Sequence, residues 1–582
     1  MYVVDSDFHA AIYSTDLERM IYRDFWSFVR SQIIGNYTIC HTPFGERLLT
    51  YVDYTASGRG VLFIEEYLKQ CLETYGNTHT EDDLTGSVTT ARMHLAEQTI
   101  KQLVNADENY RIIFNGCGTT GAVNKLQEIL GIYLPPAGRA MYAKAVGEIL
   151  PSRQQRRFTT FLERKHPLVF VGPYEHHSNE ISWRECFAEV IEIELDKDGQ
   201  LDLQDLVRQL SRQEYRDRWK IGAFSAASNV TGFKTPVYDV ARILHEHDAL
   251  AFFDYAAIAP YTKIDVRTGP KSYFDGVYFS PHKFLGGPGS AGVLIIHKKI
   301  YHEELPPTRP SGGTVEYVST DDQEYARDIE EREKPGTPGV LQILKAALAM
   351  ELAERLDFTK IERRENELIR RALGRFAECP AIEVLGNPDP LKRAAICSFN
   401  IRAPEGYLHH RFVVMLLNDL FGIQSRAGCS CAGPYGHRLL SIDREKSRIY
   451  RQRILAGEVG IKPGWVRVGF HFLMTDEELE FVCDAVCFIA EFGRYFLQAY
   501  SFDLKTGQWC HKKWNATSVI FGVDSAISAP ESSKLKRIKS KVATFRSYAE
   551  AARCEAERLK NSFMQTRLRT TDKKLIPFLY YY

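Results

Sequence analysis

Short apolar segments recur along residues 61–300, and longer stretches with the spacing of amphipathic helices separate them. Helical spacing is clear in ARMHLAEQTIKQLVN and in VYDVARILHEHD. Strands that alternate with helices predict an α/β domain whose sheet is mainly parallel. The segments typical of strands are YRIIFNGCG, PLVFVGPYEHH, AEVIEIEL, KIGAFSAAS, LAFFDYAAI, GVYFSPHK and AGVLIIHK.

The pattern changes on both sides of this region. Residues 1–60 predict a helical lead-in that ends in the strand LLTYVDYTASG, and residues 61–330 make up the large α/β domain. Residues 331–505 begin with the long helix TPGVLQILKAALAMELAERL and predict a smaller α+β domain, before a basic helical tail at 506–582. A chain of 582 residues is longer than one hydrophobic core usually supports, so two or more domains are expected.

The tail has its own charge and its own apolar repeat. Residues 534–574 hold 13 Lys/Arg against 4 Asp/Glu. A helix with one apolar stripe and a basic face can pack on the body, bind a partner or nucleic acid, or pair with a second copy, and all three readings stay open. The stripe steps by four and three residues through Ile538, Val542, Phe545, Ala549, Ala552, Ala556, Leu559 and Phe563.

Composition narrows the class of protein. Hydrophobic residues make up 44% and charged residues 25%, as in ordinary globular proteins. Lys+Arg and Asp+Glu both number 74, so the bulk charge does not point to nucleic acid, and no apolar run approaches the length of a membrane span. The N-terminus lacks the features of a secretory signal, and twelve scattered cysteines then indicate reduced thiols of a cytoplasmic protein.

Polar side chains follow several predicted strands at their carboxyl ends, where open α/β sheets bind ligands. Thr119 and Thr120 open a helix after a glycine-rich turn, and the free N–H groups of such a helix suit a phosphate. A plain helix cap is the alternative reading of this turn. Other strands deliver His176, Asn229, Asp254, Ser280, His282 and Lys283.

Together these groups are those needed to hold pyridoxal 5'-phosphate. A lysine forms a Schiff base with the cofactor aldehyde, a carboxylate pairs with the pyridinium nitrogen, and an imidazole stacks on the ring. Lys283, which lies among glycines just beyond a strand, and Asp254 fit the first two roles. For Lys283 taken alone, a solvated loop lysine is the alternative.

The chain resembles the class V aminotransferase family of fold-type I pyridoxal phosphate enzymes, and within it the cysteine desulfurase and selenocysteine lyase branch, over roughly residues 45–500. The matching motifs are YVDYTASG, GTTGAVN, EHHSNEISW, SNVTG, FSPHKFLGGPGSAGVL and GTPGV. The resemblance implies the fold of that family and the roles of individual residues. The phosphate contacts are Thr119, Thr120, Ser280 and His282, the ring-stacking residue is His176, Asn229 lies near the substrate and the ring hydroxyl, Asp254 is the partner of the ring nitrogen, and Lys283 forms the Schiff base.

The segment SRAGCSCAGPYG, residues 425–436, resembles the family's nucleophile loop, and the register implies Cys431 as the catalytic thiol. The strand VRVGFHF implies that Arg467 binds the substrate carboxylate. Arg426 is a candidate to lower the thiol pKa. As alternatives, Cys429 and Cys431 are ordinary small buried residues, or they bind a metal with His437.

Several features depart from the family pattern. Ala257 stands where the family carries a glutamine that bonds the ring hydroxyl, and Tyr255 replaces a glycine. Residues 437–465 are an insertion, and the basic tail lies outside the resemblance. The residues SGGT, 311–314, correspond to a loop that reaches the neighbouring subunit's phosphate, so a homodimer with shared sites is implied.

The expected function is therefore a pyridoxal phosphate-dependent cysteine desulfurase-like enzyme. It would act on cysteine or a related amino acid through an external aldimine, form a persulfide on Cys431, and pass the sulfur to an acceptor protein. Another class V reaction (transamination, epimerisation or β-elimination) with Cys431 idle is the second hypothesis. A scaffold that acts through its basic tail is the third.

Overall fold

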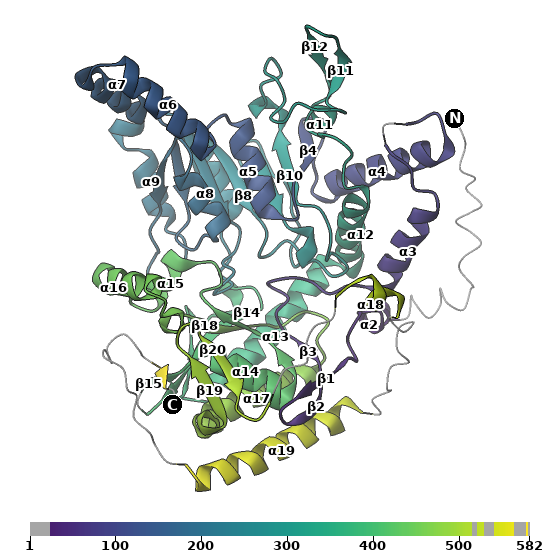
Figure 1. The fold of residues 1–582 in the computed structure, drawn as a ribbon, viewed down its shortest axis with the longest axis vertical. Helices are drawn as coiled ribbons and strands as arrows, with labels where there is room; N and C mark the ends of the chain where they lie inside the picture. Colours follow the sequence, from purple (N-terminus) through teal and green to yellow (C-terminus); the bar gives the residue numbers. More distant parts are fainter. Residues whose placement is uncertain are drawn as a thin grey trace.

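The computed structural model describes residues 24–78, 80–404, 406–514, 521–528 and 540–563, together with the backbone of 578–579. Figure 1 shows a large α/β part above and a smaller part below, with the long helix α12 (Val340–Leu356) between them. None of the described helices combines the length and the apolar character that crossing a membrane requires.

A seven-stranded sheet in the order β4-β10-β9-β8-β7-β5-β6 forms the centre of the large part. Strands β6, β5, β7, β8 and β9 pair in parallel, and β10 runs antiparallel to both of its neighbours. All seven predicted strands and the mainly parallel sheet are thus confirmed. Their bounds are β4 (Tyr110–Phe114), β5 (Leu168–Val171), β6 (Glu189–Glu192), β7 (Lys220–Ser225), β8 (Ala249–Asp254), β9 (Gly276–Phe279) and β10 (Val293–His297).

Alternate strand residues face opposite sides of the sheet, because successive side chains of a strand point to opposite faces. Phe253 and Val277 pack into one core, which α4, α9, α10 and α12 also line, and Phe252 and Tyr278 pack into the other with α5 and α8. Both faces are therefore covered, which is the arrangement that parallel sheets require. The covering helices are α3 (Leu62–Glu73), α4 (Leu84–Leu103), α5 (Thr119–Ile129), α8 (Ile181–Arg184), α9 (Leu203–Leu210) and α10 (Val237–Glu246).

The smaller part is built on a second, mainly antiparallel sheet that contains β17, β18, β14, β15 and β21, with β13 paired to β14. Part of the N-terminal lead-in joins it, since β3 (Thr50–Tyr51) pairs in parallel with β16 (Ile423–Gln424). In contrast, α2 (Phe25–Ser31) packs through Val29 on the core of the large part. Elements of the smaller part are β1 (Ile39–Thr42), β2 (Gly45–Leu48), α13 (Phe358–Ala377), β13 (Ile382–Val384), β14 (Ile396–Ala403), β15 (Gly406–Leu408), α14 (His410–Phe421), β17 (Arg426–Gly428), β18 (Trp465–Gly469), α17 (Asp476–Phe492), β19 (Tyr500–Asp503), β20 (Gln508–His511) and β21 (Phe578–Leu579).

The tail helix α19 (Lys541–Asn561) lies along the outside of the smaller part (Figure 1). The Phe545 ring stacks on the Phe481 ring of α17 at 3.8 Å between centroids, and the Leu48 N–H donates to the Tyr548 hydroxyl at 2.9 Å. Of the three readings of the tail, packing on the body is the one seen here.

The predicted stripe of α19 is wrong in two places. Val542 and Ala549 are exposed, and Tyr548 is buried in place of Ala549, so the buried positions step by three, four, four and three residues, and the Tyr548 hydroxyl accepts a hydrogen bond from the Leu48 N–H. Ile538 lies outside the described residues. The buried face consists of Phe545, Tyr548, Ala552, Ala556 and Leu559.

Three segments project from these two parts. Helices α6 (Pro136–Ile149) and α7 (Ser152–Lys165) extend as a helical hairpin without a buried residue, and β11 (Val315–Val318) and β12 (Gln323–Tyr325) form a second projecting hairpin (Figure 1). The insertion at 437–465 continues α15 (Gly433–Leu439) and forms α16 (Arg444–Leu455). The remaining short helices are α11 (Ile329–Arg332) and α18 (Val523–Ile527).

Candidate active site

A cavity of about 390 Å³ opens at the carboxyl ends of the central strands, within the range of roughly 300–1,000 Å³ typical of small-molecule sites. Residues from β7, β8, the turn after β9 and the start of α5 line it. Nine of the ten residues predicted for the site lie on its wall, and Cys431 does not. The nine are Thr119, Thr120, His176, Asn229, Asp254, Ser280, His282, Lys283 and Arg467.

One end of the cavity is a cradle of hydroxyl groups around the first turn of α5. The Thr119 N–H donates to the Ser280 hydroxyl at 2.8 Å, and the two side-chain hydroxyls lie 2.7 Å apart. The Thr120 hydroxyl lies 2.6 Å from that of Ser178. A Cβ at Gly118 would lie 2.9 Å from the Ser280 hydroxyl, so glycine keeps this corner open. Hydroxyls and the N-terminal N–H groups of a helix suit a phosphate dianion.

Lys283 and Asp254 carry opposite charges into the same cavity. Burial lowers the pKa of Lys283 to about 8, while Asp254 opposes the shift and the guanidinium groups of Arg467 and Arg426 add to it. Burial raises the pKa of Asp254 to about 6, although the Ala256 N–H donates to its carboxylate at 2.8 Å. At neutral pH the carboxylate is still ionised, which the partner of a pyridinium nitrogen must be, and the amine is close to its titration range.

The two histidines of the site are neutral at physiological pH. Burial and the nearby Lys283 lower the pKa of His176 to about 3, and burial lowers that of His282 to about 4. The Ser178 N–H donates to His176 Nδ1 at 3.2 Å, so the proton of the neutral ring lies on Nε2. A neutral, partly buried imidazole on the cavity wall is suited to stack on an aromatic ring.

Arg467 and Arg426 lie directly opposite each other on the antiparallel strands β18 and β17. Two like charges directly opposite each other on paired strands destabilise a sheet unless an anion lies between them. Arg467 donates to the Asn229 carbonyl at 2.9 Å and pairs with the Asp53 carboxylate at 2.8 Å, and both arginines line the cavity. The pair therefore favours a further carboxylate at this end.

Three buried polar atoms on the cavity wall have no partner among the described residues: Asn229 Oδ1, Ser430 Oγ and Arg467 Nε. Buried polar atoms are nearly always hydrogen-bonded, so unsatisfied atoms on one cavity wall indicate a place for a polar ligand. With the hydroxyl cradle, the buried lysine and the ionised carboxylate, this donor set fits pyridoxal 5'-phosphate and an amino acid.

The loop that holds the expected nucleophile has an unusual backbone. Ser430 and Cys431 have φ values of +51° and +56°, a region that non-glycine residues rarely adopt. The His177 N–H donates to the Cys431 carbonyl at 2.8 Å, and the Gly433 N–H donates to His177 Nε2 at 2.9 Å. The Asn229 amide donates to the Ser430 carbonyl at 2.7 Å. These bonds fix the loop with Ser430, rather than Cys431, on the cavity wall.

The departures from the family pattern are local. Ala257 lines the cavity, so no side-chain amide is present at that position, while Tyr255 is buried and its ring lies 6.2 Å from that of Phe274.

Ser430 and Asp53 are site residues that could not be predicted from the sequence. The only signal for Asp53 was its place in the YVDYTASG motif, and Ser430 had none beyond its place between the two cysteines.

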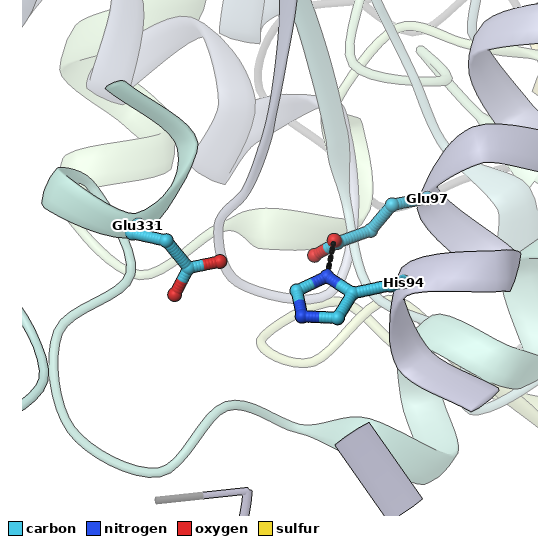
Figure 2. A group of neighbouring side chains, drawn as sticks. All are labelled: His94, Glu97 and Glu331. Carbon is cyan, nitrogen blue, oxygen red and sulfur yellow. Dashed lines mark hydrogen bonds and ion pairs between the residues drawn. The ribbon is translucent and has the colours of Figure 1, made fainter. Parts of the chain in front are cut away.

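A second group of metal-ligand side chains lies away from this cavity. Figure 2 shows His94 and Glu97 on α4 facing Glu331 on α11, with His94 Nδ1 3.0 Å from a Glu97 oxygen. The Lys334 ammonium lies 2.9 Å from Glu97 and 2.7 Å from Glu331. Because the Lys334 ammonium already pairs with both carboxylates and His94 contacts Glu97, this group is explained as an ion-pair network.

Comparison with known proteins defines the class. The family model described as "Aminotransferase class-V" matches residues 158–482, which is more than half of the chain. The chain therefore belongs to the class V aminotransferase family, whose members are enzymes that depend on pyridoxal phosphate.

Individual relatives place the chain in the cysteine desulfurase branch of this family. A "Probable cysteine desulfurase" of Halalkalibacterium halodurans is 30% identical over 392 residues, 66% of this chain and 84% of that protein. One of Staphylococcus aureus is 27% identical over 413 residues, 70% and 89% of the two chains. The fold matches a cysteine desulfurase of Thermococcus onnurineus (TM-score 0.61, 22% identity, 80% of this chain and 98% of that one) and CsdA of Escherichia coli (TM-score 0.57, 21% identity, 79% and 97%).

Proposed function

We propose that this enzyme binds pyridoxal 5'-phosphate at Lys283 and removes the sulfur of L-cysteine, leaving alanine. The observation that carries the proposal is the single cavity in which a buried lysine, a buried carboxylate and two facing arginines meet. When bound, the cofactor supplies an electron sink for the bonds at the substrate Cα. The named relatives support cysteine as the substrate.

Each residue then has a defined task. Asp254 holds a positive charge on the ring nitrogen, His176 stacks on the ring, and the hydroxyl cradle of α5 binds the phosphate. Arg467 and Arg426 bind the substrate carboxylate, because two guanidinium groups can share its two oxygens. Lys283 would be the base that moves the substrate Cα proton, and its lowered pKa of about 8 suits proton transfer near neutral pH.

Cys431 is the proposed sulfur carrier. Its thiol would attack the substrate sulfur, the Cβ–S bond would break toward the substrate, and the sulfur would remain on Cys431 as a persulfide for an acceptor protein. Because Ser430 lines the cavity in its place, the loop must release its bonds to His177 and Asn229 for the attack. The strained backbone at 430 and 431 lowers the cost of that release.

We further propose that the enzyme is a homodimer in the cytoplasm. Residues 311–314 lie at the base of the projecting β11–β12 hairpin, whose Tyr317 and Val318 are more than half exposed. The resemblance of SGGT to a loop that reaches the neighbouring subunit's phosphate supports a second subunit on this side of the molecule. Twelve free thiols support a reducing compartment.

A second candidate function is another class V reaction on an amino acid with Cys431 idle, and the absence of Cys431 from the cavity wall favours it. Product analysis separates the two. The cofactor-loaded enzyme is incubated with L-cysteine and, separately, with other amino acids, and alanine, sulfide and keto acids are assayed together. Desulfuration yields alanine and mobilised sulfur in equal amounts, whereas keto acid without alanine would establish the second candidate. Lys283→Ala should be inactive, and the exposed Lys263→Ala is the matched control.

A further inference from the structure

A second cavity lies away from the active site. It is a groove of about 1,050 Å³ between α17, α19 and the turn that follows α13, and no residue lines both this groove and the Lys283 cavity. Its floor is apolar, with the aromatic rings of Phe421, Phe481 and Phe488. Two cysteines, Cys379 and Cys487, also line it and are therefore reachable from solvent.

The two thiols touch each other. Cys379 lies just beyond the end of α13, Cys487 lies on α17, and their sulfur atoms are 2.8 Å apart. All twelve cysteines are in described ranges, and this is the one pair whose sulfurs are in contact. The two residues are 108 positions apart in the chain, so the fold rather than local sequence brings them together.

Neighbouring ion pairs hold the thiols in register. On α13 and α17, Arg371 pairs with Glu480 at 2.7 Å, and one turn further along Arg375 pairs with Asp484 at 2.6 Å. The thiol pair is the next contact in this row of contacts between the two segments, since Cys379 follows Arg375 by four residues and Cys487 follows Asp484 by three. Two helices fixed by such a ladder can be crosslinked at its end with little movement of their backbones.

We propose that Cys379 and Cys487 form a second reactive site, a dithiol that hydrogen peroxide converts to an intramolecular disulfide. In the first step the Cys379 sulfur attacks one peroxide oxygen, the O–O bond breaks, and S–OH and water form. In the second step the Cys487 sulfur attacks the Cys379 sulfur, the S–O bond breaks, and a second water leaves with the remaining thiol proton. Peroxide is thus reduced by two electrons, the two thiols are oxidised, and a dithiol reductant reverses the change.

The order of these steps follows from the surroundings of the two sulfurs. Burial, with the adjacent Cys379 thiol, raises the pKa of Cys487 to about 12, so Cys487 is a poor first nucleophile toward peroxide. Its attack on Cys379 in the second step is intramolecular, and its proton leaves with the departing hydroxyl as water. The crosslink would join the end of α13 to α17, the helix on which the tail helix packs. The site concerns only the smaller part, and the proposal stands or falls independently of the reaction at Lys283.

The test is thiol mapping on the intact, cofactor-loaded chain. The protein is treated with a small molar excess of hydrogen peroxide, remaining thiols are alkylated, and peptides are mapped by mass spectrometry without reduction. We expect a crosslinked pair of peptides that carry Cys379 and Cys487, two hydrogens lighter than their sum, which disappears after reduction with dithiothreitol. Cys379→Ser should abolish it, and Cys554→Ser, at an exposed thiol of α19, should leave it unchanged.

The wild-type map alone can overturn the proposal, so the test does not depend on the folding of a variant. Exposed Cys554 reports that the oxidant has reacted. If Cys554 is oxidised while Cys379 and Cys487 are both recovered alkylated, the pair is not a redox site. Recovery of either cysteine as a sulfonic acid, or in a disulfide with a third cysteine, would equally contradict the proposed second step.

Discussion

The lowered pKa of Lys283 predicts how the apoenzyme takes up its cofactor. Burial moves this pKa from 10.5 to about 8, which corresponds to about 3 kcal/mol of differential stabilisation of the neutral amine. At pH 7 about a tenth of such an amine is neutral, against roughly one part in three thousand for an unperturbed lysine. Only the neutral amine attacks an aldehyde, so reaction at Lys283 should be roughly 300-fold faster than its ordinary pKa would allow.

Stopped-flow absorbance on mixing the apoenzyme with pyridoxal 5'-phosphate measures this rate between pH 6 and pH 10. Because the neutral fraction grows as pH rises, the rate should rise with a midpoint at about 8 and level off above it. A small lysine analogue, for which the midpoint lies near 10.4, corrects for the titration of the cofactor itself. Asp254→Asn should move the midpoint lower, since Asp254 stabilises the ammonium. A wild-type midpoint near 10 would refute the buried amine.

Three further changes probe the site and its support. Asp254→Asn should keep the cofactor but lower kcat roughly a hundredfold or more, because the ring nitrogen loses its ionised partner. Activity within twofold of wild type would show that another acid pairs with the ring nitrogen. His177→Ala removes the bond from the Gly433 N–H to the imidazole but keeps the backbone bond to the Cys431 carbonyl, so it should raise the rate of sulfur transfer to Cys431 severalfold without altering the cofactor spectrum; unchanged single-turnover kinetics would show that this side-chain bond does not restrain the loop. Phe545→Ala should reduce the free energy of unfolding by about 3 kcal/mol in urea titrations, whereas Val542→Ala should change it little; equal effects would contradict the packing of the tail.

The strands and the cavity wall could be predicted from sequence because their causes are local. Apolar runs bounded by polar residues define the strands, and parallel strands deliver whatever follows them to one edge of the sheet. Lys283, Asp254 and Asn229 meet for that reason. Arg467 could be predicted only from the match of its motif to the family, because its strand, β18, lies far along the chain in the second sheet.

What the sequence could not predict depends on long-range packing. Nothing in SRAGCSCAGPYG indicates that Ser430 and Cys431 both adopt positive φ, because glycine is the usual signal for that conformation. The pairing of Asp53 with Arg467 joins positions 414 residues apart, and the contact of Cys379 with Cys487 depends on the relative placement of two helices. The stripe of α19 was misread at Tyr548, whose burial depends on its contact with Leu48, 500 positions away in the chain.

Persulfide mapping tests the central claim most directly. The cofactor-loaded enzyme is mixed with a few equivalents of L-cysteine, alkylated, and digested to release the peptide that contains Cys429 and Cys431. We predict one additional sulfur on Cys431, formed in a single turnover with one equivalent of alanine; it should be lost in Cys431→Ser and retained in the matched control Cys429→Ser. If wild type never gains that sulfur and Cys431→Ser turns over an amino acid as fast as wild type, the enzyme is not a desulfurase that uses this thiol.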